Sequence, residues 1–464
     1  MLRIVLLISF ITTALFAQMD EKPVVNDTLM VKKIFEKALE TGETYSLLEY
    51  LSLRIGPRLS GSEGAVKAVD WTKQVMENYG FDNVFLQEMM VPHWERGEVE
   101  AASFTDPESG NEMKLSILAI GGSIATPPEG LMAEVVPVMS LDEVDTLGEA
   151  GVKGKIVFFN RPFDQKNITT GPGYGGAVDQ RVRGASRAAK YGAIGVVVRS
   201  ITSSFDDLPH TGTLVYDTEA PRIPAAALGI QSANKLTKAL ETKPDLKLSM
   251  TLSGQWFPDA VSHNVVGELK GSEFPEKYIV VGGHLDSWDV GHGAHDDGAG
   301  CMQSISVIRL FKLLGIQPRH TIRAVMFMNE ENGTRGGKKY AELAVENKED
   351  HLIAIESDAG GFTPRGFGVT ASDATIEKMR SWLPLFHRAT ISYISKGGGG
   401  VDIRPLHNAT GTPMVGLSTD TQRLFDVHHS GKDVFESVNR RELEIGAASM
   451  AAFIYLIDKH GLAE

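Results

Sequence analysis

The sequence has a single cysteine, Cys301, among its 464 residues. A lone cysteine excludes an intrachain disulfide and a cysteine-rich metal knuckle, so the fold must rely on its hydrophobic core. Cys301 follows a Gly-Ala-Gly run inside an apolar pattern, which predicts a small buried side chain rather than a nucleophile. Any metal site must therefore use histidine, aspartate and glutamate as ligands.

Several catalytic motifs are also missing. The sequence contains no HExxH, no GxSxG and no P-loop. These absences exclude the helix-borne mononuclear metalloprotease site and disfavour a serine hydrolase or a P-loop nucleotide enzyme. The stretch Gly171–Gly176 matches the dinucleotide fingerprint GxGxxG, but ten residues separate it from the strand expected before it. That fingerprint must follow its strand at once, so we interpret residues 171–176 as a flexible loop.

After its first residues the chain has no apolar run long enough to cross a bilayer. Residues 1–17 combine one basic residue, Arg3, with an apolar run and then small residues. This pattern predicts a secretory signal peptide that is cleaved near Ala17, and hence an exported protein, periplasmic or extracellular. A membrane anchor is the alternative, but the apolar run is short and polar residues follow it.

Acidic residues outnumber basic ones, 59 against 46, and the formal net charge is −13. An acidic chain is a poor ligand for nucleic acid and for anionic membrane surfaces. We therefore predict no nucleic-acid partner and no stable membrane insertion once the signal peptide is removed. A short peptide is the predicted substrate, and a homodimer is one option for assembly.

The pattern of residue types along the chain predicts three further segments. Residues 18–116 begin with helical spacing, and residues 117–254 are β-rich with glycine and proline turns. Residues 255–464 alternate strand, loop and helix, which is typical of a mostly parallel sheet with helices on both faces. We predict an α/β fold in which residues 18–116 and 255–464 form one domain and residues 117–254 form a β-rich insert.

Acidic and imidazole side chains follow three predicted strands of the last segment, and a fourth cluster lies near the end of the chain. Each cluster alone is ambiguous, because polar residues often cap strand ends. In an open α/β sheet, however, such ends meet at one edge, where gathered carboxylates repel each other unless a divalent cation is present. The clusters are His284 and Asp286, Glu330 and Glu331, Glu356 and Asp358, and His428 and His429.

These clusters closely resemble the co-catalytic di-zinc exopeptidases, a family that includes aminopeptidases, and within it the carboxypeptidase Q branch. The resemblance covers nearly the whole chain after residue 17, and its motifs are specific as a set. The β-rich insert resembles a protease-associated domain. The matching stretches are IGPRLSGSEGAVKAVDWTK, GGHLDSWDVGHGAHDDGAG, MNEENGTRGG, ESDAGG, GGGGVDIRPL and HHSGKD.

The resemblance implies two zinc ions per chain, with cobalt or manganese as substitutes, and a role for each site residue. A water shared by the two ions would have a lowered pKa and would attack the peptide bond. The implied roles are Asp296 as the bridging ligand, His284 and Asp358 at one metal, Glu331 and His429 at the other, and Glu330 as the general base.

Three assignments choose between neighbouring side chains. Asp286 is expected behind His284, where its carboxylate would accept the second imidazole N–H and fix the tautomer. Asp296 is preferred to Asp297 because its spacing from His284 fits the family's pattern, and Asp297 is expected to cap the helix that begins near Gly298. His429 is preferred to His428 because it lies four residues before an aspartate, as in the family's pattern.

The predicted function is hydrolysis of dipeptides or of terminal residues of short peptides. The alternatives are a glutaminyl cyclotransferase, which has a reduced ligand set on a similar fold, and a non-catalytic peptide-binding homologue. The complete ligand set and the general base favour hydrolysis. The terminus that is recognised stays open: Asp402 could bind a free amine, whereas Arg404, Arg423 or Lys432 could bind a free carboxylate.

Overall fold

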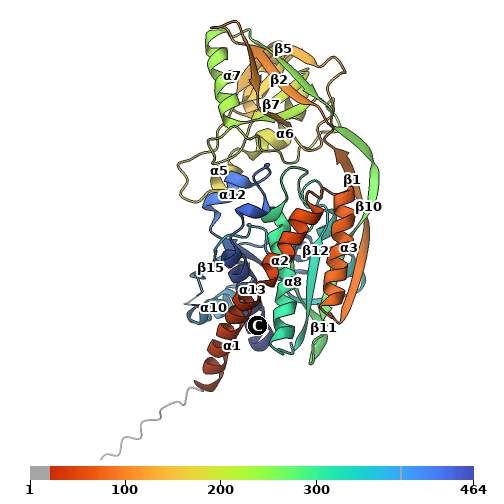
Figure 1. Cartoon of the computed structure of the whole chain (residues 1–464), viewed down its shortest axis with the longest axis vertical. Coiled ribbons are helices and arrows are strands. Elements are labelled where there is room, and N and C mark those ends of the chain that lie inside the picture. Colours follow the sequence, from red (N-terminus) through yellow and green to blue (C-terminus); the bar gives the residue numbers. More distant parts are fainter. Residues whose placement is uncertain (1–20, 387–388, 464) are drawn as a thin grey trace, which may run out of the picture.

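The computed structural model describes residues 21–386 and 389–463, so the predicted signal peptide lies outside the described residues. The described chain contains two eight-stranded sheets. We call residues 21–95 and 255–463 the first module, and residues 100–252 the second module. In Figure 1 the second module lies above the first, and strands β1 (Asn83–Glu95) and β10 (Gln255–Leu269) run along one side between them.

The first module is built on a mixed sheet whose four central strands are parallel. The strand order is β1-β10-β12-β11-β13-β16-β14-β15, and β12, β11, β13 and β16 are mutually parallel. The remaining strands are β11 (Phe274–His284), β12 (His320–Phe327), β13 (Asp350–Glu356), β14 (Pro364–Thr370), β15 (Tyr393–Lys396) and β16 (Met414–Thr419).

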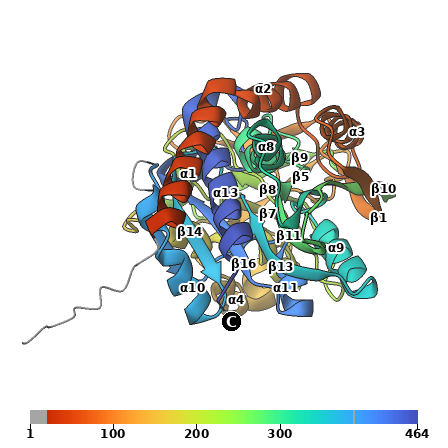
Figure 2. The ribbon, with the colours of Figure 1, turned by 90° about the horizontal axis from the view of Figure 1, so that it is seen from below.

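Successive residues of the central strands alternate between two hydrophobic cores, as the pleat of a β-strand requires. On β12, Ile322, Ala324 and Met326 enter one core, whereas Val325 and Phe327 enter the other. Helices α1, α8 and α13 lie on one side of the strands and α9 and α11 on the other (Figure 2).

The helices and helical turns of the first module are α1 (Glu21–Thr41), α2 (Glu43–Tyr50), η1 (Leu51–Ile55), α3 (Glu63–Asn78), η2 (Ala294–Gly298), α8 (Ala299–Leu313), α9 (Arg335–Glu346), α10 (Asp373–Arg380), η3 (Leu383–Phe386), α11 (Arg404–Thr410), η4 (Thr421–Arg423), α12 (Leu424–Val427), η5 (Phe435–Ser437) and α13 (Arg440–His460). None of the described helices is both long enough and apolar enough to cross a membrane.

The second module has its own sheet and its own cores. Its strand order is β3-β2-β9-β5-β6-β7-β8-β4, with β5 to β8 parallel. Helices α4 and α6 pack on one face of this sheet and α7 on the other. The elements are β2 (Glu100–Thr105), β3 (Glu112–Leu115), β4 (Ile117–Ala119), β5 (Leu131–Val138), α4 (Leu141–Val152), β6 (Ile156–Phe159), α5 (Gly171–Gly175), α6 (Val178–Ala189), β7 (Gly195–Arg199), β8 (Ala225–Leu228), α7 (Ile230–Thr242) and β9 (Lys247–Leu252).

The predicted fold class is confirmed: the chain is α/β, with helices on both faces of a sheet that is parallel at its centre. The second sheet also includes β2 and β3, which precede residue 117 in the chain. The predicted boundary at residue 117 therefore falls inside one sheet, between the end of β3 and the start of β4. Strand β2 belongs to the same sheet because it pairs with β9.

Candidate metal centre

Three adjacent parallel strands place the predicted site residues at one edge of the first sheet. β11 lies between β12 and β13, and its last residue is His284. Glu330 and Glu331 follow β12 within four residues, and Asp358 lies two residues after β13. Glycine allows the next helix to approach closely, since a Cβ on Gly283 would overlap the Asp297 side chain and the backbone at Gly300.

Asp296 directs its two carboxylate oxygens at two different histidines. Its Oδ1 lies 3.0 Å from Nε2 of His284, and its Oδ2 lies 3.2 Å from Nε2 of His429. The two histidines come from opposite ends of the first module's C-terminal half and meet at this single side chain. The two carboxylate oxygens of Asp296 therefore face two separate groups of candidate ligands.

The other two predicted ligands complete two groups around Asp296. Oδ1 of Asp358 lies 3.5 Å from Nε2 of His284, and Oε2 of Glu331 lies 3.2 Å from Nε2 of His429. The structure therefore brings all five predicted ligands together, with His284 and Asp358 on one side and Glu331 and His429 on the other.

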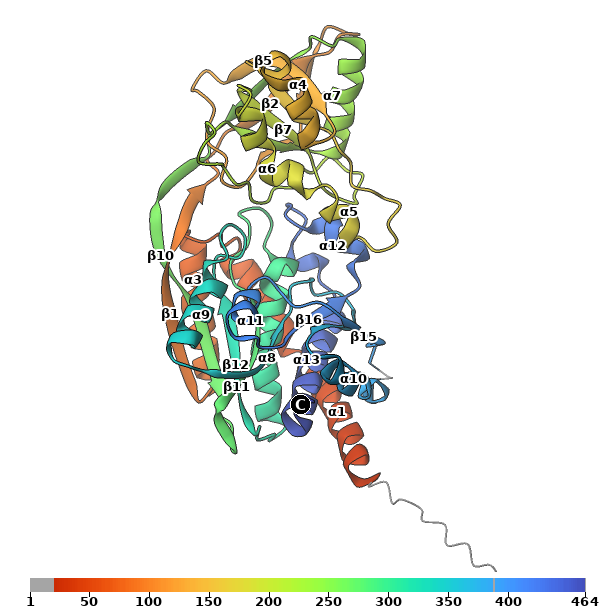
Figure 3. The same cartoon turned by 180° about the vertical axis from the view of Figure 1, so that it is seen from behind.

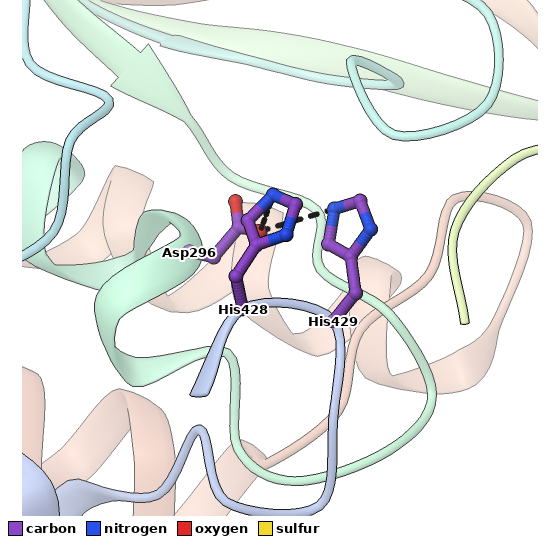
Figure 4. A group of neighbouring side chains, drawn as sticks. All are labelled: Asp296, His428 and His429. Carbon is purple, nitrogen blue, oxygen red and sulfur yellow. Dashed lines mark ion pairs between the residues drawn. The ribbon is translucent and has the colours of Figure 1, made fainter. Parts of the chain in front are cut away.

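His428 also belongs to this cluster, although the sequence pattern favoured His429 as the ligand. Figure 4 shows both imidazoles beside Asp296. Nε2 of His428 lies 3.5 Å from Oδ2 of Asp296, and its ring stacks on that of His429 with 3.6 Å between centroids. His429 pairs with both Asp296 and Glu331, whereas His428 pairs with Asp296 alone among the described residues.

The electrostatics of the cluster suit a cation. Burial, together with the Asp296 carboxylate, raises the pKa of Glu331 to about 7. Burial raises the pKa of Glu330 well above its usual range, and the carboxylates of Asp358 and Glu331 add to that shift. Burial alone would raise the pKa of Asp296, but hydrogen bonds with His284 and His429 hold it well below its usual value. A divalent ion would relieve this repulsion, and Oε1 of Glu331 is buried without a hydrogen-bond partner among the described residues.

Asp286 supports the site differently from the prediction. His284 Nδ1 lies 3.0 Å from the backbone carbonyl of Asp286, whereas the Asp286 carboxylate is 3.8 Å away. That carboxylate instead accepts hydrogen bonds from the backbone N–H groups of Glu330 and Glu331, at 3.0 and 3.3 Å. The carboxylate turns away because a backbone acceptor two residues on already satisfies the imidazole. Asp286 thus fixes the loop that presents Glu330.

Two further acids hold the backbone around Asp296. Asp297 accepts a hydrogen bond from Gly300 N at 2.9 Å, as a helix cap does, and a second from His284 N at 3.1 Å. Asp433 accepts from the backbone N–H groups of His295 and Asp296, at 2.7 and 3.0 Å. Burial raises the pKa of Asp433 to about 7. In the sequence, Asp433 served only to distinguish His429, which lies four residues before it, from His428.

The sequence did not predict that two residues of the N-terminal motif IGPRLSGSEG support the loops of the site. Arg58 is fully buried and donates hydrogen bonds to the backbone carbonyls of Leu285, His292 and Gly293. Ser60 accepts a hydrogen bond from the side chain of Asn329, at 2.8 Å. The one available signal was a basic residue inside a segment with glycine and proline, which is too common a pattern to identify a contact.

The second module closes over the site. A pocket of about 530 Å³ contains the predicted ligands together with Tyr174, Arg181 and Thr213 of the second module. The prediction of a flexible loop at residues 171–176 is wrong, because residues 171–175 form the helical turn α5 and place Tyr174 in the pocket. In Figure 3, α5 lies next to α12, which precedes the two histidines.

The residues proposed for terminus recognition lie outside this pocket. Asp402 is fully buried, and neither of its carboxylate oxygens has a hydrogen-bond partner among the described residues. Arg404 lines a neighbouring cavity, Arg423 pairs with Glu442 at 3.0 Å, and Lys432 forms an ion pair with Asp206. Asp289, which had no predicted role, forms a two-pronged ion pair with Arg96, at 2.7 and 2.6 Å.

Comparison with known proteins decides the family. The pattern of Peptidase family M28 matches residues 264–454. Carboxypeptidase Q of Bos taurus is 36% identical over 414 residues, covering 89% of this chain and 85% of that protein, and the Homo sapiens protein is 35% identical over the same span. The chain belongs to peptidase family M28. It is accordingly a metallo-exopeptidase that hydrolyses peptide bonds, and the resemblance to the carboxypeptidase Q branch is confirmed.

Solved structures of M28 proteins agree with the fold. A Peptidase M28 precursor from Shewanella amazonensis SB2B is 32% identical, with a TM-score of 0.89, over 95% of this chain and 99% of that chain. BSAP, a zinc aminopeptidase from Bacillus subtilis, has a TM-score of 0.64 over 89% of this chain and 94% of that chain. At 21% identity the second likeness shows the fold alone.

Proposed function

We propose that this M28 peptidase is an exported zinc enzyme that hydrolyses dipeptides or removes a terminal residue from short peptides. The observation behind the proposal is the pair of ligand groups that share Asp296, with His284 and Asp358 on one side and Glu331 and His429 on the other. Imidazole and carboxylate ligands without thiolate suit zinc, and cobalt or manganese as substitutes.

Two zinc ions at these groups would polarise the peptide carbonyl and activate the attacking water. The chain's own contribution is the placement and protonation of Glu330. Its backbone N–H is held by Asp286, and its side chain lines the pocket beside the ligands. Glu330 would take a proton from the water and return it to the leaving amine as the C–N bond breaks.

The size of the pocket favours a small substrate. Its volume is about 530 Å³, and residues of the second module, among them Tyr174 and Thr213, form part of its wall. A pocket of that size encloses a ligand of a few residues and excludes a folded chain. We propose that the second module acts as a protease-associated domain that limits access. Rapid degradation of folded proteins would contradict this.

Metal content and activity can be separated with two variants. In Glu330→Gln we expect about two zinc ions per chain, as in the wild type, and a fall in kcat of about 10²- to 10⁴-fold, since only the proton acceptor is lost. In Asp296→Ala we expect most of the zinc to be lost along with the activity. Elemental analysis and hydrolysis of dipeptides, aminoacyl anilides and N-blocked peptides provide the two measurements.

Glu436→Gln is a matched control, because Glu436 is exposed and lies outside the ligand clusters. It should keep both zinc and activity. A wild-type protein that binds no zinc, or a Glu330→Gln variant with full activity, would contradict the proposal.

A further inference from the structure

The pocket around the candidate ligands contains one basic side chain among its acidic ones. Among the described residues that line it, Arg181 is the only lysine or arginine. It is 6% exposed and comes from helix α6 of the second module. The sequence separates Arg181 from His429 by 248 residues, and its motifs pointed to three other cations instead.

Arg181 is held in place but has no anionic partner. It donates hydrogen bonds to the backbone carbonyl of Thr211 at 3.1 Å and to the hydroxyl of Tyr174 at 2.8 Å. Its Nε is buried without a hydrogen-bond partner, and no described aspartate or glutamate forms an ion pair with it. A buried guanidinium normally pairs with a carboxylate or phosphate, because removing its charge from water is costly.

Arg181 also lies next to the cluster of candidate ligands. Its Nη1 is 3.4 Å from Nδ1 of His429, whose Nε2 faces the carboxylates of Asp296 and Glu331. The guanidinium therefore lies one imidazole ring away from these carboxylates. Gly212 makes this approach possible, since a Cβ there would overlap both the guanidinium and His429.

We propose that Arg181, supported by Tyr174, binds the free C-terminal carboxylate of the substrate. The distances fit a single residue after the scissile bond, because one residue spans about 3.8 Å and Arg181 lies one imidazole ring away from the ligand groups. The second module would then supply a specificity residue as well as a wall, and dipeptides would be preferred. This inference rests on the proposed hydrolytic function and extends it to substrate selection.

The test compares a substrate with and without the carboxylate charge. Leu-Gly and Leu-Gly-amide share the same scissile bond and the same free amine. We expect the wild type to hydrolyse the free acid with a kcat/KM at least about 10-fold above that of the amide, because hydrogen bonds to a charged group are the strong ones. Calorimetric titration with glycine and with glycinamide should show the same preference without any turnover.

Variants then assign the preference to Arg181. Arg181→Gln should lower kcat/KM for the free acid by roughly 10- to 100-fold, mainly through KM, and leave the amide nearly unchanged. Arg183→Gln is the matched control, since Arg183 lies on the same helix and is exposed outside this pocket. It should behave like the wild type. Zinc content and thermal unfolding establish that each variant is folded.

Two results would overturn the inference. One is equal hydrolysis of acid and amide by the wild type. The other is an equal loss on both substrates in a folded, zinc-loaded Arg181→Gln variant, which would indicate a merely structural role. If Arg181→Gln does not fold, Arg181→Lys replaces it and must show a loss confined to the free acid. Failure of the proposed function looks different, because the wild type would then cleave neither substrate.

Discussion

At the scale of single residues, the site depends on side chains that each satisfy two neighbours. Asp296 faces His284 with one carboxylate oxygen and the His428–His429 pair with the other, and the carboxylate of Asp286 accepts hydrogen bonds from two backbone N–H groups. Such residues are hard to replace, because an asparagine at either position would present an N–H group where an acceptor is required.

A buried histidine outside the site makes stability depend on pH. Burial lowers the pKa of His351 to about 4, and its Nε2 accepts a hydrogen bond from Tyr340 at 2.9 Å. The unfolded chain, with a pKa near 6.5, binds a proton that the folded chain refuses. The contribution to stability is therefore complete above pH 6.5 and declines as the pH falls toward 4, by about 3 kcal/mol in all.

Urea unfolding of metal-free wild type and His351→Gln between pH 7 and pH 4 measures this term. The wild type should lose more stability than the variant over that interval, since other histidines titrate equally in both proteins. Parallel pH dependences would show that His351 takes up its proton without unfolding.

At the scale of elements, the loop after β11 is the critical segment. Leu285, His292 and Gly293 of this loop are joined through one guanidinium, that of Arg58. Because a loop that lies inside the protein cannot turn its carbonyls to water, a single buried donor group with several N–H bonds fixes its path.

Arg58→Met should leave these carbonyls without their donor. We expect a loss of at least about 3 kcal/mol in the free energy of unfolding and a weaker affinity for zinc, because the loop positions His284 and Asp296. Urea unfolding and zinc titration measure the two effects. Arg54→Met is the control, since Arg54 is exposed in the same segment. An unchanged zinc affinity in Arg58→Met would contradict the link between Arg58 and the site.

The elements also show where sequence patterns stop being informative. The predicted alternation of strand, loop and helix in residues 255–464 is present, since hydrophobic periodicity is a local property of the chain. Helix α8 is buried on nearly all sides. It packs on the sheet with one face and contacts α2 and α13 with others, and no periodicity within the helix could reveal those neighbours.

At the scale of the whole molecule, the two modules share the site. Thr211 N donates to the carbonyl of His429 at 2.9 Å, and His210 Nδ1 donates to the carbonyl of His428 at 2.7 Å. In return, Trp288 of the metal loop is 2% exposed and packs in a hydrophobic core of the second module. We infer that the modules unfold together.

Trp288→Ala tests this coupling. Removing a buried tryptophan costs about 3–5 kcal/mol, and here the loss falls at the contact between the modules. Calorimetry should show one transition in the wild type and two in the variant. Phe104→Ala, a buried aromatic of the same core away from the loop, should lower the transition temperature without splitting it. A single transition in Trp288→Ala would contradict the coupling.

The sequence by itself determined the α/β class, the residue types available as metal ligands and the strand ends that present most of the candidate ligands. These follow from local periodicity, from the absence of thiolates and from motifs a few residues long. Only the tertiary structure decided that the carboxylate of Asp286 supports Glu330, that Arg58 fixes the metal loop and that Arg181 enters the pocket. The reason is physical: such contacts join segments that lie far apart in the chain and depend on how two modules pack, which no local pattern encodes.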